Sequence, residues 1–175
     1  WVGCWATPAA FWKPFRAAGE KVRGFNRPSL KDPYSMFQRD HRKLVVIDGK
    51  IVFSGGFCVG QEWAGMDGEP PWRDTGIMIR GPAATIANRA FGRTWSIAGG
   101  IFPEPMAEEH MVAEGETSVW LIEGEPGKSR VLRTLTLVAA VARERLWITD
   151  PYFVAPGAIA EALVSAASAG VDVRV

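Results

Sequence analysis

The sequence predicts an α/β fold in which a mixed β-sheet is flanked by helices. Apolar, β-branched segments alternate along the chain with segments of helical pattern, and this alternation is typical of α/β proteins. The dipeptide Asp48-Gly49 separates two of the apolar segments, which indicates a tight β-hairpin. Among the 175 residues, 47% are hydrophobic and 22% are charged, as expected of a globular protein.

Each element follows from local signals. Proline at the first position of a helix and glycine after its end predict helix boundaries, and runs of Val, Ile and aromatic residues predict strands. The predicted helices cover residues 7–19, 82–99, 127–144 and 156–170. The predicted strands cover residues 20–25, 42–48, 50–56, 74–81, 117–123, 145–150 and 171–175. Pro14 should kink or restart the first helix, and the two hairpin strands lack alternation, which predicts burial on both faces.

The order of elements predicts two parts. A polar linker from about residue 100 to 116 separates them, and the strand and helix pattern restarts at Thr117. The chain begins without methionine and ends on a predicted strand, so we expect a segment of a longer protein.

The totals exclude several classes of protein. A net charge of +1 gives no general attraction to nucleic acid, so a nucleic-acid partner is not expected. Two cysteines without a CxxC pair predict neither a disulfide framework nor a zinc site. The longest apolar run, residues 135–142, is far shorter than the ~20 residues of a membrane span. We therefore expect a cytoplasmic or peripheral membrane location for this chain.

The chemistry lies in the segment from Asp40 to Trp63. His41 and Lys43 are two residues apart on a predicted strand, so both side chains should point to the same side. A lysine ammonium binds phosphate oxygens, and an imidazole can attack phosphorus or move a proton near neutral pH. Gly55 and Gly56 at the end of the return strand allow a close backbone approach to a ligand. These residues predict a phosphodiester site.

This segment resembles the HKD motif of the phospholipase D superfamily. The motif has His-x-Lys, four residues, Asp, six residues, Gly with Gly or Ser, one residue and Asn. His41, Lys43, Asp48, Gly55 and Gly56 fall on this pattern without a gap. The segments 71–95 and 146–175 are similar to bacterial cardiolipin-synthase-like members. The resemblance therefore covers nearly the whole chain, more loosely outside the motif.

The resemblance implies a layered phospholipase D-like fold and a division into repeats. Residues 1–112 would be the C-terminal part of a first repeat that carries the motif. Residues 117–175 would be the opening β-α-β part of a second repeat.

The resemblance also implies a mechanism without metal or cofactor. His41 would form a phosphohistidine, or protonate the leaving group, while Lys43 binds phosphate oxygens. Asp48 would hold the shape of the motif. Asp74 would hydrogen-bond a catalytic histidine, either His41 or the histidine of a second motif. The substrate would be a phospholipid, and the reaction phosphatidyl transfer or hydrolysis of the same ester.

Two departures from the family pattern leave alternatives open. Cys58 stands where the motif has a phosphate-binding asparagine, and a thiol is a weak donor. His110 has no lysine two residues later, so this chain carries one motif. The second motif would come from another part of a longer chain or from a dimer partner, and the segment alone would be inactive. The alternatives are a non-catalytic scaffold or binding module, and a dimeric phosphodiesterase or nuclease.

The aromatic and basic residues 5–16 leave two interpretations. They could face a membrane surface, or they could form a helix that packs on the sheet.

Overall fold

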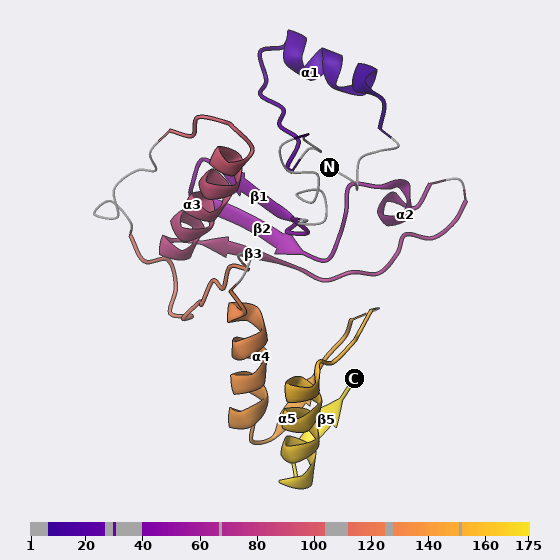
Figure 1. The fold of residues 1–175 in the computed structure, drawn as a ribbon, viewed down its shortest axis with the longest axis vertical. Helices are drawn as coiled ribbons and strands as arrows, with labels where there is room; N and C mark the ends of the chain where they lie inside the picture. Colours follow the sequence, from indigo (N-terminus) through magenta and orange to yellow (C-terminus); the bar gives the residue numbers. More distant parts are fainter. Residues whose placement is uncertain are drawn as a thin grey trace. The chain divides into compact units, whose positions relative to one another are not determined.

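A computed structural model of the chain describes residues 7–26, 30, 40–66, 68–103, 112–124, 128–150 and 152–175. The chain divides into two compact units, Trp1–Leu121 and Ile122–Val175. Figure 1 shows the helices and strands of each unit. The α/β class predicted from the sequence is confirmed, because one unit holds an antiparallel sheet and the other a parallel strand pair, each with helices.

The first unit contains a three-stranded antiparallel sheet. Its strands are β1 (Leu44–Ile47), β2 (Ile51–Gly55) and β3 (Gly76–Arg80), and β2 lies between the other two. The predicted strands 42–48, 50–56 and 74–81 are therefore present, although each is shorter than predicted. The ladder between β1 and β2 runs from the pair Leu44 and Ser54 to the pair Ile47 and Ile51.

The turn between β1 and β2 has the predicted hairpin conformation. Asp48 and Gly49 both have positive φ, 53° and 65°, as a type I′ turn requires. The backbone N–H of Lys50 donates to the carbonyl oxygen of Ile47 at 3.0 Å and closes the turn. Helix α3 (Pro82–Ile97) is tied to this turn, because the Thr85 hydroxyl donates to the carbonyl of Gly49 at 3.3 Å.

The core of the first unit lies between the sheet and α3. Val52 of β2 and two alanines of α3, Ala84 and Ala87, are 0% exposed. Small side chains on the helix let its backbone approach the sheet closely, so β2 packs directly against it. Residues packed around this cluster are Leu44, Val46, Ile79 and Leu121.

The predicted burial of the hairpin strands on both faces is wrong. Burial alternates along β1, where Val45 and Ile47 remain 49% and 42% exposed. The physical reason is the single helical layer: α3 covers the face that carries Val46 and Val52, while the described residues leave the opposite face more open.

Replacing Val52 by Ala is expected to lower the free energy of unfolding of the first unit by about 2 kcal/mol, because two methyl groups leave a packed site. Val45→Ala is the matched control on the same hairpin, since Val45 is half exposed, and it should cost about 0.5 kcal/mol or less. Urea unfolding followed by tryptophan fluorescence measures both. Equal losses would show that α3 does not bury this sheet face.

The N-terminal helix is divided as predicted. A 3₁₀ turn, η2 (Ala9–Trp12), is followed by α1 (Lys13–Ala17), with Pro14 in the first turn of α1. The rings of Phe11, Trp12 and Phe15 contact one another, with centroids 4.9–5.9 Å apart. Phe11 and Phe15 are nevertheless 52% and 45% exposed.

Two predicted strands are wrong. Residues 20–25 and 117–123 have no strand structure, and they join neither sheet of the described chain. Both segments contain suitable apolar residues, but a strand also requires a hydrogen-bonding partner along its length. A short helix α2 (Gln61–Ala64) lies between β2 and β3.

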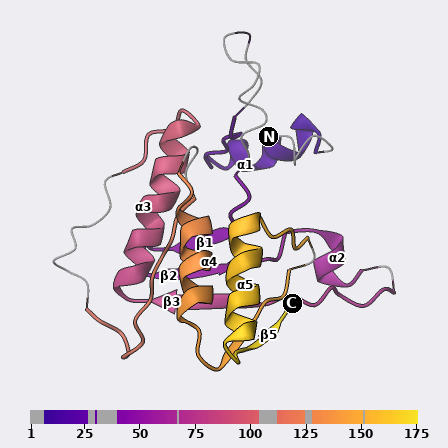
Figure 2. The same cartoon turned by 60° about the horizontal axis from the view of Figure 1, so that its bottom comes forward.

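The second unit pairs two helices with two parallel strands. Its elements are α4 (Arg130–Val141), β4 (Arg145–Trp147), α5 (Gly157–Ser168) and β5 (Asp172–Arg174). Helices α4 and α5 lie side by side in both views (Figures 1 and 2). The core of this unit is formed by Ala139, Ile159 and Leu163. The assignment of the chain to a first and a second repeat remains a prediction.

Candidate active site

His41 and Lys43 lie immediately before β1, in a segment without regular secondary structure. Their predicted placement on a strand is therefore wrong: β1 begins at Leu44, and it is an edge strand of the described sheet. The reason is the β1–β2 ladder, which ends at the pair Leu44 and Ser54, one residue before Gly55-Gly56.

The side chains of His41 and Lys43 nevertheless lie on one side of the chain, as predicted. The ammonium nitrogen Nζ of Lys43 lies 2.9 Å from Nδ1 and 2.8 Å from Nε2 of His41. It also donates to the carbonyl oxygen of His41 at 3.1 Å. The side chain of His41 is exposed. A substrate can therefore reach the imidazole.

Arg42, between these two residues, contacts another element. Its guanidinium forms an ion pair with Asp40 at 2.9 Å and donates to the hydroxyl of Thr94 on α3. Burial alone would raise the pKa of the Asp40 carboxyl, but the hydrogen bonds and charge of Arg42 and the charge of His41 lower it overall. These contacts connect the segment before β1 to α3, and so they hold the backbone around His41 in place.

Asp74 precedes β3 and accepts hydrogen bonds from two directions. The indole Nε1–H of Trp63 donates to Oδ2 at 3.0 Å, and the backbone N–H of Thr75 donates to Oδ1 at 2.7 Å. The indole hydrogen bond is the largest cause that lowers the pKa of Asp74, followed by the bond from Thr75, the backbone of Gly56 and the charge of Lys43. The carboxylate is therefore held ionised within the field of Lys43.

The structure shows no hydrogen bond between Asp74 and His41, both of which it describes. The ammonium of Lys43 contacts the imidazole, and its positive charge is the smallest of the causes that lower the pKa of Asp74. That Asp74 serves the histidine of a second motif remains a prediction.

The two glycines of the motif have close neighbours within the protein. A Cβ atom on Gly56 would lie 2.7 Å from Oδ1 of Asp74, and a Cβ on Gly55 would lie 2.8 Å from the carbonyl oxygen of Thr75. Glycine is therefore required here for internal packing, whatever else it contacts. We call His41, Lys43, Gly56 and Asp74 the histidine–lysine site.

Two predicted residues lie apart from these contacts. Asp48 is in the hairpin turn, at the opposite end of β1 from His41. Cys58 follows β2 with a free, half-buried thiol, and its carbonyl oxygen accepts a hydrogen bond from the N–H of Gly60. The structural role expected for Asp48 agrees with this position, and the phosphate-binding roles of Gly55, Gly56 and Cys58 remain predictions.

Trp63 is the contact residue that the sequence analysis did not identify. It stands 11 residues before Asp74, and tryptophan more often indicates core packing than a hydrogen bond to a site residue. The signal in the sequence for this contact was a tryptophan and an aspartate on the two sides of a short loop rich in glycine and proline.

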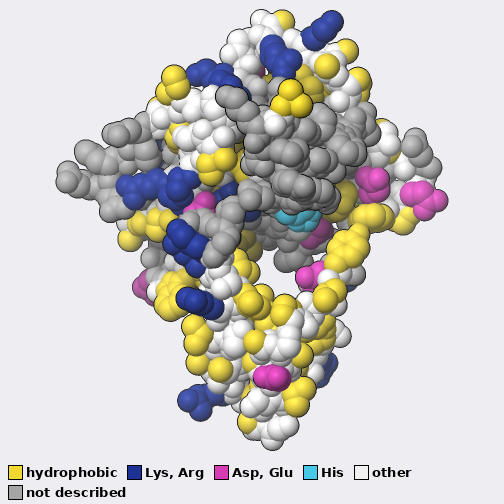
Figure 3. All heavy atoms as spheres, viewed as in Figure 1, with side chains coloured by type: hydrophobic (Ala, Val, Ile, Leu, Met, Phe, Trp, Pro, Cys, Tyr) yellow, Lys and Arg dark blue, Asp and Glu magenta, His cyan; other side chains and the backbone are white. Residues whose placement is uncertain are grey.

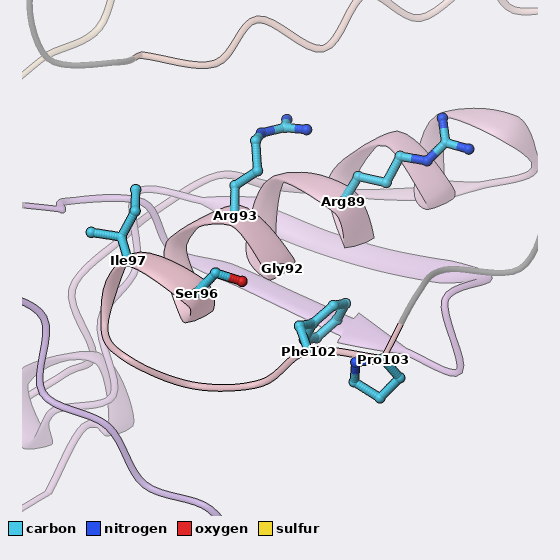
Figure 4. Close-up of a pocket in the computed structure, with 7 residues that line it drawn as sticks. All are labelled: Arg89, Gly92, Arg93, Ser96, Ile97, Phe102 and Pro103. Carbon is cyan, nitrogen blue, oxygen red and sulfur yellow. The ribbon is translucent and has the colours of Figure 1, made fainter.

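A separate groove of about 540 Å³ lies on α3 (Figure 4). It is lined by Arg89, Gly92, Arg93, Ser96, Ile97, Phe102 and Pro103. None of these residues belongs to the histidine–lysine site, so the groove is distinct from it. Lys and Arg side chains gather over the region of α3 in Figure 3.

Further searches of the described residues concern metals and membranes. In the part of the chain that the structure describes, no three His, Cys, Asp or Glu side chains are grouped so that they could hold a metal ion. Within the same residues, no helix has both the length and the apolar character needed to cross a bilayer.

Comparisons with known proteins find relatives of one named kind. The chain is 36% identical over 182 residues to a cardiolipin synthase of Geobacillus thermodenitrificans and 33% identical over 177 residues to cardiolipin synthase A of Pseudomonas syringae. It is 35% identical over 178 residues to cardiolipin synthase A of Pseudomonas aeruginosa. Each alignment covers 99% of this chain but only 36–37% of the relative. No family model matches the chain, and no solved structure matches it.

The similarity of nearly the whole chain to cardiolipin synthases relates it to the phospholipase D superfamily. Within that superfamily it is related to the cardiolipin synthases, over nearly its whole length.

Proposed function

We propose that this chain supplies one catalytic half of a phospholipase D-type phosphatidyltransferase of the cardiolipin synthase kind. The observation that carries the proposal is the contact between the Lys43 ammonium and the His41 imidazole, at the motif spacing. The names of the relatives supply the substrate class, a phospholipid. The second half of the site comes from another motif, in the same polypeptide or in a second copy.

The proposed reaction uses His41 as nucleophile. A ring nitrogen attacks the phosphorus of a phosphatidyl ester, a phosphorus–nitrogen bond forms, and the bond to the leaving alcohol breaks. The histidine of the second motif donates its proton to that alcohol and then accepts a proton from the incoming alcohol. The incoming oxygen attacks phosphorus and frees His41. With two molecules of phosphatidylglycerol the products are cardiolipin and glycerol; with water the reaction is hydrolysis.

The side chains around His41 suit this chemistry. Lys43 lies within hydrogen-bonding distance of both ring nitrogens, so a phosphorus bound to either nitrogen places its non-bridging oxygens beside the ammonium. Preorganised positive charge stabilises the negative charge that grows on those oxygens in the transition state. The exposure of His41 leaves room for a lipid headgroup.

The test is turnover by the whole protein with three substrates. Vesicles of phosphatidylglycerol should yield cardiolipin and glycerol, while single-stranded and duplex DNA should remain intact. Cleavage of DNA without lipid turnover would favour a nuclease. Binding to vesicles without turnover of either substrate would favour a scaffold, the alternative raised by Cys58 in place of asparagine.

Peripheral contact with a membrane is part of the proposal, because the substrate lies in a bilayer. Flotation of the whole protein with phosphatidylglycerol vesicles measures this contact.

Replacing Lys43 by Ala is expected to lower kcat of the whole protein by about 10²–10³-fold, the usual effect of removing one preorganised donor. The Lys43 ammonium contacts His41, and its charge lowers the pKa of Asp74. Its loss removes the positive charge that stabilises the transition state next to the imidazole. Steady-state turnover of phosphatidylglycerol measures the effect. Lys50→Ala is the control, since Lys50 is exposed beside the hairpin turn, and it should turn over normally.

A further inference from the structure

The loop between β2 and β3 is closed on itself beside the histidine–lysine site. The backbone N–H of Trp72 donates to the carbonyl oxygen of Glu62 at 2.8 Å. The indole rings of Trp63 and Trp72 meet edge to face, with centroids 5.1 Å apart. Gly65 ends helix α2 in the left-handed region, φ 67°, with Pro71 packed against it. These contacts fix the direction of the Trp63 indole.

The fixed indole meets the site at a single carboxylate oxygen. Its Nε1–H donates to Oδ2 of Asp74, while the other oxygen, Oδ1, accepts from Thr75 and faces Gly56. Because each oxygen accepts from a different donor, the carboxylate group is held in one rotational orientation. Because Gly56 has no side chain, the carboxylate lies against the backbone that follows β2.

We propose that Trp63 is a positioning residue of the histidine–lysine site. Its indole N–H holds the Asp74 carboxylate in a fixed orientation against the backbone of Gly56 in that site. Trp63 touches no reacting atom in this arrangement and acts through Asp74. The catalytic part of this inference rests on the proposed function, while the hydrogen bond and its effect on Asp74 do not.

The charged groups around Asp74 bear on the direction in which its pKa shifts. Lys43 is the charged group whose field lowers the pKa of Asp74. Glu62 of α2 turns its carboxylate toward Gly60, and the adjacent Arg73 is exposed. Removing the indole donor takes away the largest cause of the lowered pKa, so the pKa must rise toward the ordinary aspartate value.

The first experiment is an NMR titration of the 175-residue chain. We expect the indole proton resonance of Trp63 to follow the same midpoint as the Asp74 side-chain carboxyl carbon, and to lose this step in Asp74→Asn. In Trp63→Phe, which keeps an aromatic ring against Trp72 but has no donor, the Asp74 midpoint should move to higher pH. Trp72→Phe is the matched control and should leave that midpoint in place.

The second experiment measures kcat and KM of the whole protein. Trp63→Phe should lower kcat about tenfold, since a hydrogen bond to a charged group is lost, and should leave KM nearly unchanged. Trp72→Phe should keep both kcat and KM of the unmodified protein.

The outcomes separate the two proposals. Two results would overturn the positioning role whatever the activity. One is a titration midpoint of Asp74 that does not change in Trp63→Phe. The other is a Trp63 indole proton resonance that does not shift as Asp74 titrates. If Trp63→Phe does not fold, the titrations of the unmodified chain and of Asp74→Asn still test whether the Trp63 indole responds to the ionisation of Asp74. Absence of lipid turnover in a protein whose NMR titration behaves as expected would refute the proposed function alone.

Discussion

His41→Ala is expected to reduce phosphatidyl turnover by the whole protein on the order of 10⁴-fold or more, the scale reached when a catalytic nucleophile is removed. The loss follows from the proposed mechanism, in which the imidazole forms the bond to phosphorus. Among the described residues, Lys43 is the base in contact with His41, and its ammonium form carries no free electron pair with which to replace the imidazole. Release of glycerol from phosphatidylglycerol vesicles gives the rate.

Two controls make this experiment decisive. His41 is exposed and lies outside the sheet, so its truncation should leave the unfolding midpoint within the range of surface substitutions. Lys50→Ala alters a cation of the same hairpin outside the site and should retain turnover. A His41→Ala protein with near-normal rates would remove His41 from the mechanism and, with it, the proposed function.

The hairpin was predictable because its signal is local. Positive φ at Asp48 and Gly49 depends on those two residues and their immediate neighbours. The same locality explains the restart of the first helix at Pro14. Helix α3 was predicted for the same reason, since Pro82 begins it and an apolar pattern continues through it.

Strand boundaries depended on partners and were less predictable. Residues 20–25 and 117–123 have strand-like composition without joining the described sheets. The start of β1 at Leu44 depends on its ladder with β2, which ends at the pair Leu44 and Ser54. The sequence of residues 42–48 alone does not contain that information.

The candidate site was partly predictable. The spacing of His41 and Lys43 on extended backbone was enough to predict that their side chains meet. The environment of Asp74 was not predictable. It depends on the loop between β2 and β3, which brings Trp63 into contact with a carboxylate 11 residues further along the chain. The close packing of Gly56 against the carboxylate likewise appears only once both segments are in place.

The 175-residue chain alone is expected to show no phosphodiester turnover as a monomer. The described half-site offers one imidazole with its lysine, while the proposed reaction requires a nucleophile and an acid at the same time. Without a positioned acid the leaving alkoxide departs unprotonated, which forfeits about 10²–10⁴-fold of rate. The exposed His41 is also in contact with water, and water weakens the attraction between Lys43 and a phosphate.

A second copy of the chain can supply the acid that one described site lacks. A two-fold dimer that brought two His41 side chains to one phosphorus would supply nucleophile and acid from identical residues. Turnover per chain should then be absent at low concentration and rise with concentration as the dimer forms. The measurement is hydrolysis of a chromogenic phosphodiester across a concentration series, with sedimentation to give the oligomeric state and the His41→Ala chain as control for contaminating activity. Constant turnover per chain from a monomer, absent in the His41→Ala chain, would mean that a single motif suffices and that the two-histidine mechanism is wrong.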